Sequence, residues 1–371
     1  MERAIIIRTK LDSLSYVARI RHVKKVEVTF VPFDTARFNF AVVLPDYGVG
    51  GWNGFVNFLK LLWSRSIRIK LTEAVRTSSF IFAEAPSFEA WLVSRIAWGM
   101  RKRLNLEINT ESTLDFRYMW QRFGLMGFIM IPMISMSFKY VRMRSVAALY
   151  MNKALLDKYP ISDLNNVAIC SPSLSKEWYL LSRRSFSSPA SKFLYVGNLE
   201  KVKQIDFILK AFHLKRKFLH SGWKFELIGD GPERLSLEKL VGRLGLESHV
   251  VFRGRVKHGK NLRSIFMDND MLLISSFSET GPRVLLEALA LGLPVLSTKV
   301  GLAQELLSSD CLAEIGDLRG YANKLLHLSF DQKLLSIISE TNCEKAKLFS
   351  EEILSKKEND FFERVINKLN G

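Results

Sequence analysis

Short apolar runs alternate with amphipathic stretches along most of this chain. Strand-length runs separated by helical patterns of about 10–15 residues predict βαβ units, which build a parallel sheet. In the first half we expect strands at residues 4–7, 26–31, 40–44, 80–83 and 104–108. The pattern therefore predicts an α/β protein with doubly wound sheets.

The alternation is more regular in the second half of the chain. We expect strands at residues 193–196, 224–228, 250–252, 271–274 and 295–297, and helices at 205–218, 233–244, 262–266, 284–291 and 319–328. A sheet built in this way binds ligands beyond the carboxyl ends of its strands.

A Ser-rich segment with one Pro, residues 180–192, separates the two halves and predicts a linker. We therefore expect two Rossmann-like domains, residues 1–187 and 188–340, that face each other across a cleft. The tail, residues 341–371, has a charged helical pattern, and we expect it to pack back toward the N-terminal domain.

One apolar segment, residues 123–138, holds 16 residues without a charge and is interrupted by Gly127 and Pro132. A helix that spans a bilayer needs about 20 such residues. A transmembrane helix, a buried helix-turn unit and partial insertion into one leaflet all remain open. Upstream lie aromatic and cationic groups of the kind found at membrane interfaces, namely Trp91, Trp98, Trp120, Arg101, Lys102 and Arg103.

Composition and charge narrow the class of protein. The chain has 371 residues, 48% of them hydrophobic, which excludes a disordered protein. Residues 1–190 hold 27 Lys and Arg against 14 Asp and Glu, net +13, whereas residues 191–371 hold 27 against 23, net +4. A basic first half favours an anionic partner, either a phosphate ligand, a nucleic acid or an anionic membrane surface. Charge that serves only solubility is the alternative.

The cysteines and the N-terminal residues indicate in which cellular compartment the protein is expected. Cys170, Cys311 and Cys343 are far apart and lack CxxC spacing, so the sequence predicts neither a disulfide framework nor a zinc site. The apolar run at residues 4–7 is too short for a signal peptide. We expect the protein in the cytoplasm, with the cytoplasmic face of the membrane as a further expectation.

Glycine-bearing turns follow three of the expected strands in the second half. Glycine lets the backbone come close to a ligand, and the amides of the following helix suit a phosphate or diphosphate. The residues placed at such a nucleotide site are Gly197, Asn198, Gly229, Gly231, Pro232 and Arg253.

The strongest motif is SETGPRVLLEAL, residues 278–289. Pro282 stands where a helix begins, so Thr280 and Gly281 lie at a positive helix end. Glu279 precedes that end and Glu287 lies inside the helix, about 8 Å along the axis at about 1.5 Å per residue. Two carboxylates therefore flank an anion site, which fits a nucleotide sugar with its diphosphate at the amides.

Residues 193–352 resemble the donor domain of the retaining GT-B glycosyltransferases, specifically glycosyltransferase family 4, the glycosyl transferases group 1. The resemblance rests on YVGNLEKVKQIDFILKAF, FELIGDGPE, VVFRGRV, NDMLLISSFSETGPRVLLEALALGLPVLST and KLFSEE. It implies that Glu279 contacts the transferred sugar, that Glu287 contacts the ribose, and that Lys203 holds the donor diphosphate. A lysine there neutralises leaving-group charge without a metal.

The chain departs from the family pattern at several ligand positions. Asn198 stands where the family has an arginine, so either leaving-group stabilisation is weaker or Arg253, Arg255 or Arg283 compensates. The first half lacks the family's glycine pair after the first strand, although residues 48–51 carry glycines after a later one. The family's histidine is also absent there, and Glu111 is the candidate for a polar role near that position.

The expected function is transfer of a sugar from a nucleotide-diphosphate donor, UDP- or GDP-linked, to an acceptor hydroxyl without a cofactor or metal. The basic, aromatic first half favours a saccharide or lipid-linked acceptor, such as a surface-polysaccharide precursor, and a peripheral membrane contact. A catalytically weak nucleotide-sugar-binding protein of the same fold is the alternative. Nucleic-acid binding would need cations aligned on one face with stacking aromatics, and we expect no such partner.

Overall fold

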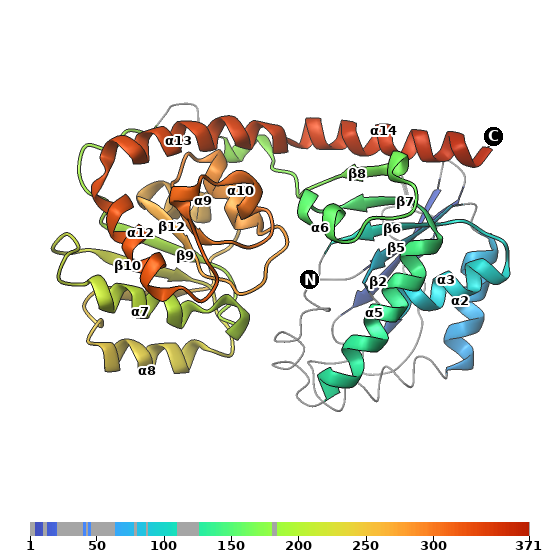
Figure 1. Cartoon of the computed structure of the whole chain (residues 1–371), viewed down its shortest axis with the longest axis horizontal. Helices are drawn as coiled ribbons and strands as arrows, with labels where there is room; N and C mark the ends of the chain where they lie inside the picture. The colour runs from blue at the N-terminus through green and yellow to red at the C-terminus, as the bar shows by residue number, and fades with distance from the viewer. Residues whose placement is uncertain are drawn as a thin grey trace. The chain divides into compact units, whose positions relative to one another are not determined.

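The computed structural model describes residues 4–9, 13–20, 40–41, 44–45, 64–77, 80–86, 88–109, 126–179 and 184–370 (Figure 1). The chain forms two compact units: Met1–Cys170 with Glu358–Gly371, and Ser171–Lys357. The boundary lies at 170/171, whereas the sequence suggested 187/188. Leu174 and Trp178 account for the difference, because both side chains are buried in the core of the second unit.

The first unit contains a mixed sheet. Its strands are β1 (Ala4–Thr9), β2 (Ser13–Ile20), β3 (Phe40–Ala41), β4 (Leu44–Pro45), β5 (Phe80–Ala85), β6 (Leu104–Ile108), β7 (Ser145–Tyr150) and β8 (Val167–Ile169). Their order is β3-β2-β1-β5-β6-β7-β8, with β4 paired to β2. Strands β5 to β8 are parallel, as expected, but β1 is antiparallel to both β2 and β5.

Strand β2 was not expected from the sequence. It pairs with its neighbour β1 from Thr9↔Ser13 onward, an antiparallel pairing that needs only a short turn. Strands β7 and β8 also went unpredicted. The expected strand at residues 26–31 lies outside the described residues.

Helices α2 (Arg65–Thr77), α3 (Phe88–Gly99), α5 (Met126–Arg144) and α6 (Lys153–Lys158) belong to the first unit. Helix α5 includes residues 126–138 of the apolar segment, and residues 123–125 lie outside the described residues. The helix buries Ile134, Phe138 and Val141, which recur at helical spacing. Pro132 lies inside it and Arg142 and Arg144 in its last turn. In the described part of the chain, no helix combines the length and the apolar character that crossing a membrane requires.

The C-terminal tail consists of two helices joined by a short 3₁₀ turn. Helix α13 (Gln332–Ala346) belongs to the second unit, and α14 (Glu351–Asn370) enters the first unit at Glu358. There Phe361, Phe362 and Val365 pack with Ala147 and Leu149 of β7. An amphipathic C-terminal segment thus completes the core of the first unit.

The second unit is a parallel sheet of β9 (Lys192–Val196), β10 (Lys224–Ile228), β11 (Val250–Gly254), β12 (Met271–Ile274), β13 (Val295–Thr298) and β14 (Leu312–Ala313). Their order is β11-β10-β9-β12-β13-β14. The helices between them are α7 (Ile205–Lys215), α8 (Arg234–Leu244), α9 (Lys260–Asp268), α10 (Arg283–Ala290), α11 (Ala303–Leu306) and α12 (Leu318–Phe330). The expected strands and helices of this half are confirmed, with ends shifted by a few residues.

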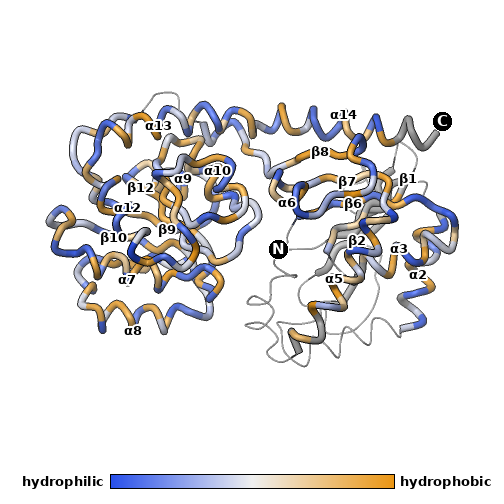
Figure 2. Tube along the Cα trace, viewed as in Figure 1, coloured by the Kyte–Doolittle hydropathy of each residue, from blue (hydrophilic) through white to orange (hydrophobic). Residues whose placement is uncertain are grey.

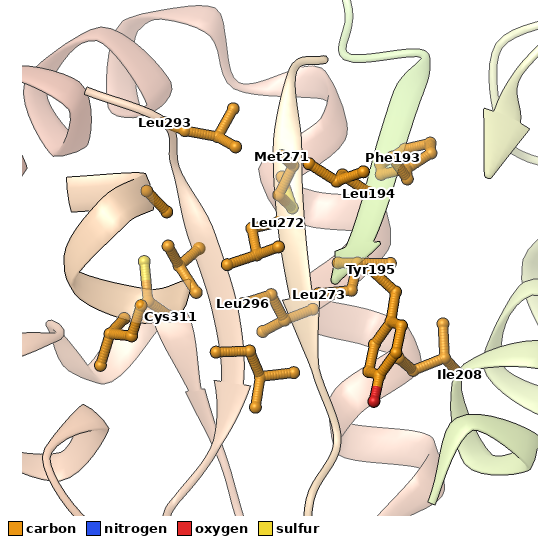
Figure 3. Close-up of a cluster of buried hydrophobic side chains, with 14 of the residues drawn as sticks. Phe193, Leu194, Tyr195, Ile208, Met271, Leu272, Leu273, Leu293, Leu296 and Cys311 are labelled. Carbon is orange, nitrogen blue, oxygen red and sulfur yellow. The ribbon is translucent and has the colours of Figure 1, made fainter. Parts of the chain in front are cut away.

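The core of the second unit shows why its strands appear in the sequence as unbroken apolar runs. Phe193, Leu194 and Tyr195 of β9 lie beside Met271 and Leu273 of β12, and all are buried (Figure 3). Because helices cover both faces of the sheet, side chains on both faces are apolar, and β9 is correspondingly orange in Figure 2.

The strand order fixes where a site can form. From β9 the chain proceeds outward through β10 to β11 and then returns to β12, on the other side of β9. The loops after β9 and β12 therefore lead to helices on opposite faces, and the carboxyl edge between them is where such sheets usually form a ligand crevice.

Candidate functional site

Lys203 and Glu279 meet at the crevice between the loops after β9 and β12. Lys203 ends the 3₁₀ turn Lys201–Lys203, and its ammonium forms an ion pair with the Glu279 carboxylate. The two side chains are 22% and 16% exposed. Ser276 Oγ donates to the same carboxylate oxygen at 3.1 Å. Two residues 76 positions apart are thus brought together with their charges largely shielded from water.

The two loops that carry this pair are tied to each other. The Ser275 hydroxyl, fully buried, is shared between the carbonyl oxygens of Lys203 at 2.7 Å and Gln204 at 2.8 Å. The amide of Phe277 donates to Val202 O at 2.8 Å. These bonds hold the lysine turn against the glutamate loop.

Glu287 lies on α10, about one turn after the helix start, and is only 3% exposed. His258 Nε2 is 2.9 Å from Glu287 Oε1, and Arg283 Nε is 3.4 Å from the same oxygen. A buried carboxylate requires such partners, because an unpaired charge away from water is strongly unfavourable. The His258 ring packs on buried Trp178, with ring centroids 5.0 Å apart.

The start of α10 lies between the two carboxylates. Pro282 precedes the first helical residue, Arg283, with φ of −65°. The amides of a first helical turn have no acceptor within the helix and carry partial positive charge. The Thr280 carbonyl upstream accepts from the amide of Leu302 at 2.9 Å, which fixes the loop before this helix end. In this arrangement the helix amides can bind an anion, and the Glu279 and Glu287 carboxylates can accept hydrogen bonds from hydroxyl groups of a ligand.

The glycines after β9 and β10 have a close protein neighbour. A Cβ at Gly229, where φ is +135°, would lie 1.9 Å from Gly197 O. A Cβ at Gly231 would lie 2.4 Å from Leu199 O. The turns after β9 and β10 are in contact, so these glycines are already required by loop packing. Pro232 is exposed beside them.

Asn198 and Arg253 are placed differently from the other predicted residues. Asn198 is exposed, and its amide nitrogen is 3.4 Å from Glu200 Oε1. Arg253 forms two hydrogen bonds with Glu226, at 2.7 and 3.2 Å, and this carboxylate raises the pKa of Arg253. Because β11 is the edge strand, two strands away from β9, the structure does not bring Arg253 to the Lys203–Glu279 pair. Arg283 Nε lies 3.4 Å from Glu287 Oε1, and Arg255 is exposed.

The structure adds residues that sequence reasoning missed. The sequence analysis assigned no role to His258, Trp178 or Tyr195, since they lie at no motif spacing. Tyr195 is buried under the turn after β9 and donates to Asn198 O at 2.9 Å (Figure 3). Burial, with a smaller contribution from the nearby Glu279 charge, raises the pKa of Tyr195 well above its usual value.

Other predicted features give no further chemistry. Residues 48–51, Trp120 and Glu111 lie outside the described residues. Among the residues that the structure describes, no group of three or more His, Cys, Asp and Glu side chains is arranged to hold a metal ion. Cys170, Cys311 and Cys343 all lie in the described part of the chain, where they form no disulfide bond.

Comparison with known proteins agrees with this picture of the second unit. Residues 183–341 match the family described as Glycosyl transferases group 1. N-acetyl-alpha-D-glucosaminyl L-malate synthase of Bacillus anthracis is 30% identical over 183 residues, 48% of this chain and 47% of that protein. A Campylobacter jejuni protein, GalNAc-alpha-(1->4)-GalNAc-alpha-(1->3)-diNAcBac-PP-undecaprenol alpha-1,4-N-acetyl-D-galactosaminyltransferase, is 36% identical over 108 residues, 28% of this chain and 29% of that protein. The matched regions thus span about half or less of these relatives.

Solved structures extend the likeness to both units at the level of fold. Anabaena Alr3699/HepE in complex with UDP has a TM-score of 0.64 at 15% identity, covering 88% of this chain and 86% of that one. Sucrose-phosphate synthase from Thermosynechococcus elongatus has a TM-score of 0.66 at 16% identity, covering 91% and 86%. The predicted α/β fold of GT-B type is confirmed, and residues 183–341 are similar to the glycosyl transferases group 1 domain.

Proposed function

We propose that this protein is a retaining glycosyltransferase that moves a sugar from a nucleotide-diphosphate sugar to a hydroxyl group of an acceptor. The observation that carries the proposal is the Lys203–Glu279 pair, which the loops after two adjacent strands hold beside the start of α10. A sugar diphosphate needs positive charge at the diphosphate and a hydrogen-bond acceptor at the sugar. This pair supplies both from neighbouring atoms.

The donor would lie along the carboxyl edge of the second sheet. Its diphosphate would bind Lys203 and the first-turn amides of α10, its sugar hydroxyls would reach Glu279, and its ribose hydroxyls would reach Glu287. Each hydrogen bond to an ionised side chain contributes about 1.5–3 kcal/mol, which is enough to fix the orientation of the donor. Lys203 would exchange part of its contact with Glu279 for the phosphate oxygens.

In the proposed reaction the bond between the anomeric carbon and the diphosphate oxygen breaks. The acceptor oxygen forms its bond to that carbon on the same face, and the acceptor hydroxyl gives its proton to an oxygen of the departing diphosphate. Negative charge develops on the departing diphosphate, where Lys203 and the helix amides are already oriented to stabilise it. The proposal therefore includes catalysis without a metal.

Similar proteins guide the choice of substrates. The Anabaena neighbour was solved with UDP and with UDP-glucose, so a UDP-linked donor is the first to test. The name of the Campylobacter jejuni relative describes an undecaprenol-linked saccharide as acceptor. We extend this to a lipid-linked saccharide, such as a precursor of a surface polysaccharide, as the acceptor class.

The test begins with thermal unfolding of the protein against UDP-, GDP-, ADP- and CMP-linked sugars. A donor at 100 times its dissociation constant stabilises the folded state by about 2.7 kcal/mol. The stabilising donor is then incubated with lipid-linked saccharides, with and without EDTA, and NMR reports the anomeric configuration of the product. Transfer with retention in the presence of EDTA supports the proposal, and an inverted product overturns it. Glu279→Gln serves as the matched variant and should bind donor but transfer little sugar.

A catalytically weak nucleotide-sugar-binding protein is the second candidate. It is favoured by the exposed, neutral Asn198 and by the ion pair that holds Arg253 away from the pair at the crevice. Such a protein would be stabilised by a nucleotide sugar yet release no sugar from it, either to an acceptor or to water. Donor hydrolysis measured in the same samples separates the two candidates.

A further inference from the structure

The exposed side of helix α5 is apolar. Met136 and Met143 are 73% and 57% exposed, and Phe128 and Pro132 are exposed on the same side, at spacings of four and seven residues. Ile134, Phe138 and Val141 face the opposite way and are buried in the first unit. The helix therefore shows apolar side chains both to the core and to solvent.

This pattern is unusual for a helix on the surface of a protein. Such a helix normally carries polar residues on its outward face. The exposed stripe of α5 contains a single charged residue, Lys139, between Met136 and Met143. The apolar stripe continues onto α3, which packs beside α5, through Trp98, which is 60% exposed. The Arg144 guanidinium joins the two helices, lying 5.1 Å from the centre of the Trp98 ring.

Cations surround this apolar stripe. Residues 88–109 and 126–144 contain seven Lys and Arg but only two acids, Glu89 and Glu107, and α5 contains no acid. The contact between Arg144 and Trp98 brings the basic end of α5 beside the end of α3, which the basic residues 101–103 follow. The cations of the patch are Arg95, Arg101, Lys102, Arg103, Lys139 and Arg144, whereas Arg142 lies over the Phe138 and Tyr159 rings on the inward side of α5.

We propose that the exposed stripe of α5, with Trp98 and the surrounding cations, docks the protein on the surface of an anionic lipid bilayer. Met136, Met143 and Trp98 would enter the boundary between headgroups and acyl chains, and the cations would contact the anionic headgroups. Apolar area combined with charge attraction is what holds interfacial helices at membranes. The surface goes beyond the proposed sugar transfer, and its test uses no enzymatic activity.

Charge also distinguishes a lipid surface from a second copy of the chain. A symmetric dimer would bring the same patch together with itself and place its exposed cations, such as Arg101, Lys139 and Arg144, opposite those of the second copy. Like charges facing each other across an interface oppose association. An anionic bilayer complements both the apolar stripe and the cations.

The experiment is co-sedimentation of the full chain with phosphatidylcholine vesicles and with vesicles containing about 30% phosphatidylglycerol, at about 0.1 M and 0.5 M salt. We expect binding to the anionic vesicles that weakens with salt, because salt screens exposed charges. The variant Trp98→Gln/Met136→Gln/Met143→Gln should bind at least about tenfold more weakly. The variant Arg101→Gln/Lys139→Gln should bind about tenfold more weakly and depend less on salt than the unchanged protein.

The matched control replaces three equally exposed apolar residues of the second unit: Phe218→Gln/Leu235→Gln/Ile337→Gln. It should bind anionic vesicles like the unchanged protein, and circular dichroism establishes that all variants fold. The proposal is overturned if the unchanged protein does not sediment with anionic vesicles at low salt, or if the control weakens binding as much as the α5 variant. It is also overturned if size-exclusion chromatography shows a dimer that only the α5 substitutions dissociate.

Discussion

His258 Nε2 lies 2.9 Å from Glu287 Oε1, so a half-exposed imidazole on the loop after β11 contacts a carboxylate buried on α10. The imidazole is itself held by packing on Trp178. This relationship positions the carboxylate that we propose for the ribose of the donor. His258 is therefore a positioning residue whose effect should be visible only through Glu287.

Replacing His258 by Ala should raise the dissociation constant of the stabilising nucleotide sugar about tenfold, the equivalent of one weak charged hydrogen bond. His258→Gln should recover most of the affinity, because its amide nitrogen can donate from a similar position. Isothermal titration calorimetry measures both. With the 2′,3′-dideoxy form of the same donor, the three proteins should bind alike; a tenfold loss that persists with this donor would mean that His258 does not act through the ribose.

Removing one partner of the Lys203–Glu279 pair should destabilise the protein. Lys203→Met leaves the Glu279 carboxylate partly buried without its cation, and we expect a loss of about 1–3 kcal/mol in the free energy of unfolding. The double variant Lys203→Met/Glu279→Gln should regain much of that loss, since no unpaired charge remains. Urea unfolding of the unchanged protein, Lys203→Met, Glu279→Gln and the double variant gives the coupling energy between the two side chains. Additive effects of the two substitutions would contradict a direct interaction.

The two tight turns should tolerate no side chain at Gly229. Gly229→Ala would place a methyl group 1.9 Å from Gly197 O, at a φ of +135°. We expect a loss of about 2–3 kcal/mol in the free energy of unfolding. Gly242→Ala in the same unit is the control, because Gly242 lies inside helix α8 and its Cβ would have only an ordinary contact, 3.6 Å from Glu247 Oε1. That variant should gain about 0.5–1 kcal/mol.

Arg253 and Arg283 should differ in their effect on donor binding. The Arg253 guanidinium is held by Glu226 on the edge of the sheet, so Arg253→Gln should leave the donor dissociation constant within about twofold. Arg283 lies 3.4 Å from Glu287 at the start of α10, and Arg283→Gln should weaken binding about fivefold or more. Equal effects of the two substitutions would show that Arg253 leaves Glu226 for the donor.

Alkaline pH should destabilise the protein through Cys311. Burial raises the pKa of this thiol from 9.0 to about 11. The folded state keeps the proton where the unfolded chain has lost it, so the free energy of unfolding falls as pH rises from 9.0 to about 11. The complete difference corresponds to about 2.7 kcal/mol. Urea unfolding of the protein and of Cys311→Ala between about pH 8 and 10.5 tests this, and identical slopes would exclude Cys311 as the source.

The fold of the second unit could be predicted because its information is local. The residues of β9 and β12 are buried on both faces, so each appears as a short apolar run, and helical patterns separate them. Strand β2 escaped prediction because the pattern was interpreted throughout as βαβ, whereas β1 and β2 pair as sequence neighbours. The unit boundary escaped because the burial of Trp178 depends on contacts with distant residues such as Phe266.

The candidate site was only partly visible in the sequence. The spacing of Glu279 and Glu287 is local to one loop and helix, and it could be recognised. Lys203 could be assigned only by resemblance, since 76 residues separate it from Glu279. His258 gave no signal, because its role depends on a ring contact with Trp178 and on a helix that begins 25 residues later. The glycines could be recognised in the sequence as positions where the backbone can approach a ligand. In the structure Gly197 and Gly229 pack against each other, so these glycines are also needed for contact between the two turns.

The Ser275 hydroxyl, shared by the carbonyls of Lys203 and Gln204, has a consequence for engineering this protein. It makes the turn after β9 and the loop after β12 a single module in which the lysine and the glutamate move together. A loop transplanted from a relative to change the sugar preference would therefore carry its partner loop with it. Swapped alone, either loop would lose its anchor and leave the remaining half of the site misaligned.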